Sequence, residues 1–167
     1  MVTTDEKGPL TAKKKSVIIR SCDGDEFLVS ESAAVLSTSL KKILEEKEDR
    51  LIHLSDIDNK TLAMVIAYLS THADDGLSDD LKRSFDQEFV SGKEFDVLKY
   101  LVLATDTLQV TCLCYTVAKK MADIMKNKLV EWVRREFDIQ NDYTPEAEAE
   151  IRRLDAWAWD DRQLEDD

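Results

Sequence analysis

The chain has 167 residues, 43% of them hydrophobic, which is enough for one domain with an appended lobe built around a real core. Its formal net charge of -12 at pH 7 makes it strongly acidic. Such a charge repels nucleic-acid phosphates and anionic lipid, so we expect no nucleic acid and no membrane among its partners. With only 4 Gly and 2 Pro and many helix formers, the composition favours a mostly helical fold.

Three cysteines, Cys22, Cys112 and Cys114, are an odd number without disulfide spacing, which predicts reduced thiols in the nucleus and cytoplasm. No apolar run reaches the roughly 18 residues of a membrane-spanning helix, and the N-terminus lacks the apolar core of a signal peptide. Residues 13–15 are lysines, which are either a weak nuclear-import patch or a solvated flank.

The first half of the chain predicts an α+β arrangement. After an expected disordered lead at residues 1–15, the β-branched residues 16–21, the Asp23-Gly24 turn and residues 26–29 predict a β-hairpin. The segments expected to follow are two short helices at 30–36 and 40–46, a strand at 51–54, and a helix that Asp58 and Asn59 cap and that ends near His72.

The middle of the chain begins with residues 73–84, whose acidic composition predicts a mobile loop. A helix is expected at 95–105, with Asp106 and Thr107 breaking it. Residues 110–125 carry a continuous apolar stripe at helical spacing and predict the clearest helix of the chain.

The last helices have recognisable start and stop signals. One amphipathic segment ends near Phe137, and a polar connector follows at residues 140–142. Thr144 can cap a further helix whose first position is Pro145, with acidic residues in its first turn and Arg152 and Arg153 toward its end. The tail at 160–167 is acidic and has little to fold around.

Catalytic and metal-binding patterns are weak. His53 and His72 have no Cys or Ser placed as a nucleophile partner, and there is no Gly-rich phosphate loop or nucleophile elbow. Cys112 and Cys114 lack the second pair that a tetrahedral metal site needs, and Cys114 lies in the apolar stripe. We therefore expect no catalytic residues, no metal and no cofactor, and an enzyme of unknown type stays as a rival interpretation.

Large apolar side chains are in surplus near the C-terminus. Leu129, Val133 and Phe137 form one helical face, and Trp132 lies off it. Further members of the surplus are Ile151, Leu154, Trp157 and Trp159. Either these side chains pack together, or they form a partner site with aromatic anchors. The residues by themselves leave both alternatives open.

Four segments carry a resemblance to a known family. Residues 137–146 read Phe-Asp-Ile-Gln-Asn-Asp-Tyr-Thr-Pro-Glu, and further motifs of the same family occur at 21–27, 65–72 and 85–89. The chain resembles the S-phase kinase-associated (Skp-type) adaptors, which join F-box proteins to a cullin in SCF ubiquitin ligases. The resemblance implies an α+β, mostly helical fold, in which a BTB/POZ-like core carries a C-terminal helical extension.

The resemblance also implies a division of the chain and a binding site. The implied segments are the lead 1–15, the core 16–126, the extension 127–159 and the tail 160–167. The implied F-box-binding residues are Met121, Ile124, Met125, Val133, Phe137, Ile139, Tyr143, Ile151 and Trp157. An obligate interface of this kind would bury ~2,000 Å² or more.

The implied cullin-facing residues are Thr105, Asp106, Thr107 and Leu108, where the family usually has Ala-Asn-Tyr-Leu. An unpaired carboxylate in a hydrophobic contact costs a few kcal/mol. The chain also lacks the family's Thr-Pro within residues 127–134, and 154–156 read Leu-Asp-Ala in place of Glu-Asn. These departures mark a divergent member.

The resulting hypothesis is a non-catalytic adaptor that links an F-box protein to a cullin. The alternative is a BTB-like protein that binds F-box proteins, or associates with itself, outside a cullin ligase. A homodimer is expected when the F-box protein is absent.

Overall fold

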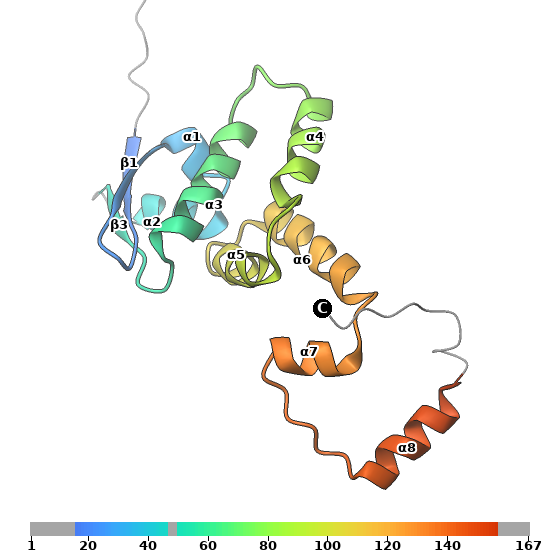
Figure 1. The fold of residues 1–167 in the computed structure, drawn as a ribbon. Coiled ribbons are helices and arrows are strands. Elements are labelled where there is room, and N and C mark those ends of the chain that lie inside the picture. Colours follow the sequence, from blue (N-terminus) through green and yellow to red (C-terminus); the bar gives the residue numbers. More distant parts are fainter. Residues whose placement is uncertain (1–15, 47–49, 157–167) are drawn as a thin grey trace, which may run out of the picture. The chain divides into compact units, whose positions relative to one another are not determined.

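The computed structural model describes residues 16–46 and 50–156 (Figure 1). The elements within these ranges are, in chain order, β1 (Ser16–Arg20), β2 (Glu26–Ser30), α1 (Glu31–Ala34), α2 (Thr38–Glu46), β3 (Leu51–His53), α3 (Asn59–His72), α4 (Asp79–Val90), α5 (Phe95–Thr107), α6 (Thr111–Met125), α7 (Val130–Glu136) and α8 (Pro145–Leu154). The expected lead, Trp157, Trp159 and the acidic tail lie outside the described residues.

The chain divides into two compact units whose border lies between Val117 and Ala118, inside α6. The sequence predicted a core that continued to residue 126. We describe each unit by itself.

The N-terminal unit contains a three-stranded sheet with the order β2-β1-β3. β1 and β2 are antiparallel, which confirms the predicted hairpin, and β1 and β3 are parallel. Gly24 has a φ of 90°, a conformation that glycine adopts without steric cost in the hairpin turn. Burial alternates along the strands, and Val17, Ile19, Val29 and Ile52 face the core.

Helix α3 is central to this core, since it contacts α1, β2 and α5. Leu62, Val65 and Leu69 of its predicted apolar stripe are buried, while Ile66 is half-buried, and α5 contributes Leu98 and Leu101. Asp58 caps α3, as predicted, because its carboxylate accepts the Thr61 N–H at 3.0 Å. This hydrogen bond is the main reason why the pKa of Asp58 lies below its usual value.

The predicted acidic loop ends earlier than expected, because α4 begins at Asp79. Ser78 caps this helix by accepting the Leu81 N–H at 3.4 Å. Asp79 and Asp80 occupy the first turn, where the helix dipole favours negative charge. Acidic residues that suggested a loop therefore start a helix, and the loop is confined to residues 73–78.

The predicted break at Asp106 and Thr107 is also corrected, because α5 includes both residues. The helix ends at Thr107 with Leu108 as its C-cap, and Gln109 follows with a left-handed φ of 52°. The Val110 N–H then bonds to the Thr105 C=O at 2.9 Å. This is a Schellman ending, formed here without the glycine that usually marks it.

Candidate protein-interaction site

Helix α8, in the C-terminal unit, starts where its sequence signals predict. The Thr144 hydroxyl accepts the Ala147 N–H at 3.2 Å, and Pro145 occupies the first helical turn. Arg152 and Arg153 lie in the last turn, where they complement the helix dipole. The local sequence is therefore sufficient to define this helix.

Helix α7 closes with a second Schellman ending. The Ile139 N–H bonds to the Arg134 C=O at 2.8 Å, and Asp138 adopts a φ of 51° between them. Glycine or asparagine is the usual residue at this position, so Asp138 holds a less favourable conformation. This turn ends α7, and the connector that leads to α8 follows it.

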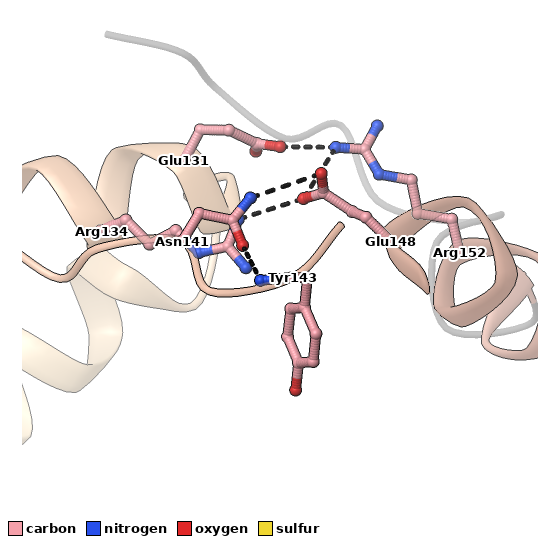
Figure 2. Close-up of polar contacts among 6 residues, drawn as sticks. All are labelled: Glu131, Arg134, Asn141, Tyr143, Glu148 and Arg152. Atoms are coloured by element: carbon pink, nitrogen blue, oxygen red, sulfur yellow. Dashed lines mark hydrogen bonds and ion pairs between the residues drawn. The ribbon is translucent and has the colours of Figure 1, made fainter. Parts of the chain in front are cut away.

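A group of polar side chains, which we call the α7–α8 clasp, joins the two helices (Figure 2). The Glu148 carboxylate of α8 accepts from Arg134 of α7 at 3.1 Å and from Asn141 of the connector at 3.4 Å. Arg152 of α8 donates to Glu131 of α7 at 2.6 Å and lies 3.8 Å from Glu148. The clasp therefore consists of these five side chains from three consecutive segments.

Glu148 is the centre of the clasp, because it contacts three of the other four members. The hydrogen bond from Arg134 is the largest cause that holds the pKa of Glu148 below its usual value, and the charge of Arg152 adds to it. Glu148 thus stays ionised at neutral pH and keeps both guanidinium groups in place.

Apolar side chains are exposed around the clasp. The predicted binding residues that are exposed are Phe137 (41%), Ile139 (53%), Tyr143 (52%) and Ile151 (37%). Figure 2 shows the Tyr143 ring pointing away from the clasp, while its N–H donates to the Asn141 side chain at 3.2 Å. Helix α8 has no buried residue at all. Four of the nine predicted residues are therefore exposed in the part of the C-terminal unit that the structure describes.

Two further apolar side chains belong to this surface, although they were absent from the predicted set. Val130 is 40% exposed and Leu154 is 60% exposed. Their spacing from Val133 and Ile151 is three residues, which places each pair on one helix face. This spacing was the signal that could have identified them.

Other predicted members are less accessible. Met121 is buried, while Ile124, Met125 and Val133 are half-buried, and Trp157 lies outside the described residues. Trp132, which was counted in the apolar surplus, is buried in the free chain. The Lys128 ammonium lies 5.6 Å from the centre of its ring, within the range of a cation–π contact.

The four residues predicted to face a cullin form the last turn of α5 and its cap. Thr105 and Leu108 are fully buried, so only Asp106 and Thr107 present side chains to the surface. Ser37, which directly precedes α2, donates its hydroxyl proton to the Leu108 C=O. Ser39 donates in the same way to the Thr107 C=O at 2.9 Å, so the start of α2 holds this turn.

His72, one of the two histidines considered for catalysis, lies in a contact between α3 and α4. Its ring stacks on Tyr68 at 4.0 Å, and its Nε2 atom lies 3.1 Å from the Asp86 carboxylate of α4. Burial is the main cause that raises the pKa of the Tyr68 hydroxyl. Phe85 and Phe89 complete the aromatic contact, which joins the two helices.

Residues 16–46 and 50–156 contain no group of three His, Cys, Asp or Glu side chains able to hold a metal ion. In the same ranges, no helix is both long and apolar enough to cross a bilayer.

A small α+β core followed by helices with uncovered apolar side chains defines a class of protein-interaction modules. Residues 15–74 match the family model described as the Skp1 family, tetramerisation (POZ) domain, and residues 112–158 match the Skp1 family, dimerisation domain. The chain belongs to the Skp1 family. This confirms the resemblance found in the sequence, and with it the BTB/POZ-like core that carries a helical extension.

Relatives agree over most of the chain. SKP1-like protein 4 of Arabidopsis thaliana is 35% identical over 161 residues, which cover 88% of this chain and 98% of the relative. SKP1-like protein 20 of Oryza sativa subsp. japonica is 33% identical, with 88% and 96% covered. SKP1-like protein 17 of Arabidopsis thaliana is 33% identical, with 87% and 97% covered.

Proposed function

We propose that this chain is a non-catalytic adaptor in an SCF-type ubiquitin ligase. Its C-terminal helices bind the F-box motif of a substrate receptor, and its POZ-like core binds a cullin scaffold. The adaptor contributes no chemistry to ubiquitin transfer. It raises the effective concentration of substrate near the ubiquitin-charged enzyme, which is how a bridging protein accelerates a reaction. Membership of the Skp1 family supports an adaptor role in general.

The observation that carries the F-box proposal is that Phe137, Ile139, Tyr143 and Ile151 are exposed in the unit that contains the α7–α8 clasp. Exposed aromatic and branched side chains are the usual anchors of a protein interface. Helices α7 and α8 are joined through charged groups, and Ile151 and Leu154 of α8 are exposed. A partner with an amphipathic helical motif offers the complementary apolar face.

Affinity capture with mass spectrometry tests this proposal. We expect Phe137→Asp to lose F-box proteins, because the new carboxylate would be buried without a partner in the interface. Leu81→Asp is the matched control, since Leu81 is 56% exposed on α4 and lies outside the site. Trp157→Ala should behave like Phe137→Asp. Equal recovery of F-box proteins with Phe137→Asp and with the wild type would show that the surface is wrong.

A second candidate function is F-box binding without a cullin, and the exposed Asp106 favours it. If the carboxylate weakens cullin binding, a chain with Asp106→Asn and Thr107→Tyr should recover more cullin, because these residues restore the family's usual pair. Strong cullin recovery by the wild type, with no gain in the double variant, would favour the full adaptor role.

We also propose that the chain associates with itself, since the two matched family models are described as a dimerisation domain and a tetramerisation domain. A second copy would be the partner of the chain when no F-box protein is present. The nucleus and the cytoplasm remain the proposed location, and fluorescence imaging of the tagged chain in living cells tests it.

A further inference from the structure

Strand β2 forms one edge of the three-stranded sheet in the N-terminal unit. It has five residues and contains neither proline nor lysine, the residues that commonly block an edge. β3, at the other edge, has only three residues, and a short edge strand offers little to pair with. Among the described residues no strand lies beyond β2. β2 is therefore the edge that can accept an added strand.

The hydrogen bonds of β1 show which backbone groups of β2 point outward. The Ile18 N–H donates to the Arg50 C=O at 2.8 Å, on the β3 side of β1. The Ser21 N–H, just after β1, donates to the Asp25 C=O at 2.9 Å, on the β2 side. Backbone groups alternate between the two neighbours of a strand, so the odd-numbered residues of β1 bond toward β2.

Leu28 lies at the centre of the open edge. Val17 and Ile19 of β1 lie directly opposite Val29 and Phe27, so these two residues of β2 bond to β1. Leu28 lies between them and directs its N–H and C=O to the outer edge. Its side chain is 74% exposed, on the face of the sheet opposite the core. Leu28 thus offers a donor, an acceptor and an apolar side chain to an added strand.

The hairpin end of this edge is acidic. Asp25 directly precedes β2, and Asp23 lies two residues earlier, in the turn. The Asp25 carboxylate accepts from the Asn59 side chain at 2.6 Å, and the Asp23 carboxylate accepts the Asn59 N–H at 2.8 Å. Neither carboxylate pairs with a cation among the described residues. The negative charge at this end therefore attracts a basic side chain.

The rest of the edge is electrically balanced. Glu31, which directly follows β2, pairs with Arg50 at 3.2 Å, and Glu26 within the strand pairs with Arg20. A second copy of this chain is a poor occupant, because antiparallel pairing of two β2 strands about their centre places Glu31 of one copy opposite Asp25 of the other. A strand with one basic end fits the edge better.

We propose that β2 binds an extended segment of a partner protein, which adds antiparallel to the sheet as a fourth strand. An apolar residue of the segment lies opposite Leu28 and exchanges two backbone hydrogen bonds with it. An arginine or lysine three residues further toward the C-terminus lies opposite Asp25. Main-chain hydrogen bonds supply the affinity, and the basic residue sets the direction of the segment. This edge shares no residue with the candidate F-box site or with the residues predicted to face a cullin.

A seven-residue probe tests the proposal. Its sequence is Ser-Thr-Val-Ile-Val-Thr-Arg with both ends blocked, which places the isoleucine opposite Leu28 and the arginine opposite Asp25. We expect fluorescence anisotropy of the labelled probe to show saturable binding to the full chain. The same peptide with an N-methyl group on the isoleucine keeps every side chain but loses the central donor, and it should bind about tenfold more weakly.

The direction of the added strand has its own control. The probe with its sequence reversed carries the arginine at the N-terminal end, so antiparallel addition would place it opposite Glu31, which Arg50 already neutralises. The reversed probe should therefore bind more weakly than the original. Equal binding of the two probes overturns the proposed direction, and equal binding of the N-methylated probe overturns the backbone pairing.

Variants of the chain locate the binding surface. Leu28→Pro removes the outward N–H but no hydrogen bond of the sheet, so it should keep the circular dichroism of the wild type and lose the probe. Asp25→Asn should weaken binding and make it less sensitive to salt. Asp75→Asn, at an exposed aspartate of the loop before α4, is the matched control and should bind like the wild type. Unchanged binding by Leu28→Pro contradicts the proposed edge.

Hydrogen exchange measured by NMR identifies any other occupant of the edge. We expect the Leu28 N–H to exchange rapidly in the free chain at every protein concentration and slowly when the probe is added. Protection without the probe that rises with protein concentration assigns the edge to a second copy. Protection without the probe that is independent of concentration assigns it to another segment of the same chain. Either result overturns the proposal, and so does a probe that does not bind.

Discussion

Helices α5 and α8 carry apolar residues at the same helical spacing, but only α5 is covered. In α5, Leu98 and Leu101 are completely buried. In α8, the equivalent pair, Ile151 and Leu154, are 37% and 60% exposed. The spacing of each pair is three residues, so periodicity does not distinguish the two helices.

The difference lies in how each unit holds its helices. In the N-terminal unit, α3 contacts α1, β2 and α5 and shares a core with them, so burial stabilises each helix. In the C-terminal unit, α8 has no buried residue and is joined to α7 through the clasp. Charged contacts between partly exposed groups stabilise little. The contrast therefore shows that burial holds the helices of the first unit together, whereas α8 is joined to α7 mainly by polar contacts among the described residues.

The largest expected effect comes from the buried face of α5. Leu101→Ala should lower the free energy of unfolding by about 2–5 kcal/mol, because it removes buried methyl groups and leaves a cavity. Leu103→Ala is the control in the same helix, since Leu103 is 65% exposed, and its effect should stay within about 0.5 kcal/mol. Urea denaturation followed by circular dichroism measures both free energies of unfolding, and similar losses would contradict the claim that burial stabilises α5 in the N-terminal unit.

Ser37 should give the next largest effect. Its hydroxyl is buried, donates to the Leu108 C=O and accepts the Leu40 N–H at 3.1 Å. Ser37→Ala leaves both backbone groups buried without this partner, which costs about 1–3 kcal/mol. Ser39→Ala removes a single hydrogen bond, which is exposed to solvent, so its loss of unfolding free energy should be smaller. The same urea denaturation compares the two variants, and a larger loss with Ser39→Ala would contradict the role of Ser37.

A smaller effect is expected at the clasp, and it should be local. Glu148→Gln removes the charge that holds Arg134 and Arg152, so hydrogen exchange should become faster in α8 while the N-terminal core is unchanged. Glu150→Gln is the matched control, because Glu150 pairs only with Arg153 of the same helix among the described residues. Slow exchange of α8 in both variants would show that the clasp does not hold the helix.

The smallest effect is the pH dependence of the clasp. The pKa of Glu148 is lowered in the folded chain, so its contribution to stability is complete above the ordinary pKa of 4.5 and disappears as the pH falls through the lowered value. Carboxyl-carbon NMR titration should show Arg134→Gln raising the pKa of Glu148. The pKa of Glu150, which Arg153 lowers, should not change in that variant. A Glu148 titration that is insensitive to Arg134 would contradict the assigned cause.

Local signals predicted most elements because their causes are local. The cap at Asp58, the Thr144-Pro145 start of α8 and the hairpin turn at Gly24 all use side chains or backbone conformations within a few residues. The misplaced boundaries involve helix ends and starts without the usual markers. Gln109 takes the left-handed conformation normally left to glycine, and Asp79 starts a helix in a segment that its composition assigned to a loop.

The exposure of the candidate site residues could be predicted only in part. The family resemblance implied Phe137, Ile139, Tyr143 and Ile151, which are exposed. The same resemblance also implied Met121, which is buried. Spacing shows which side chains share a face, but it cannot show whether another segment covers that face.

The sequence by itself determined the order and type of the secondary structure except for α4, together with the strand alternation and the acidic character of the chain, because each depends on neighbouring residues or on composition. Only the tertiary structure decided that Trp132, Thr105 and Leu108 are buried. It also decided that α5 continues through Asp106, and that Glu148 pairs with Arg134 of another helix. Burial and ion pairing depend on segments that are distant along the chain, and no local pattern records which of them come together.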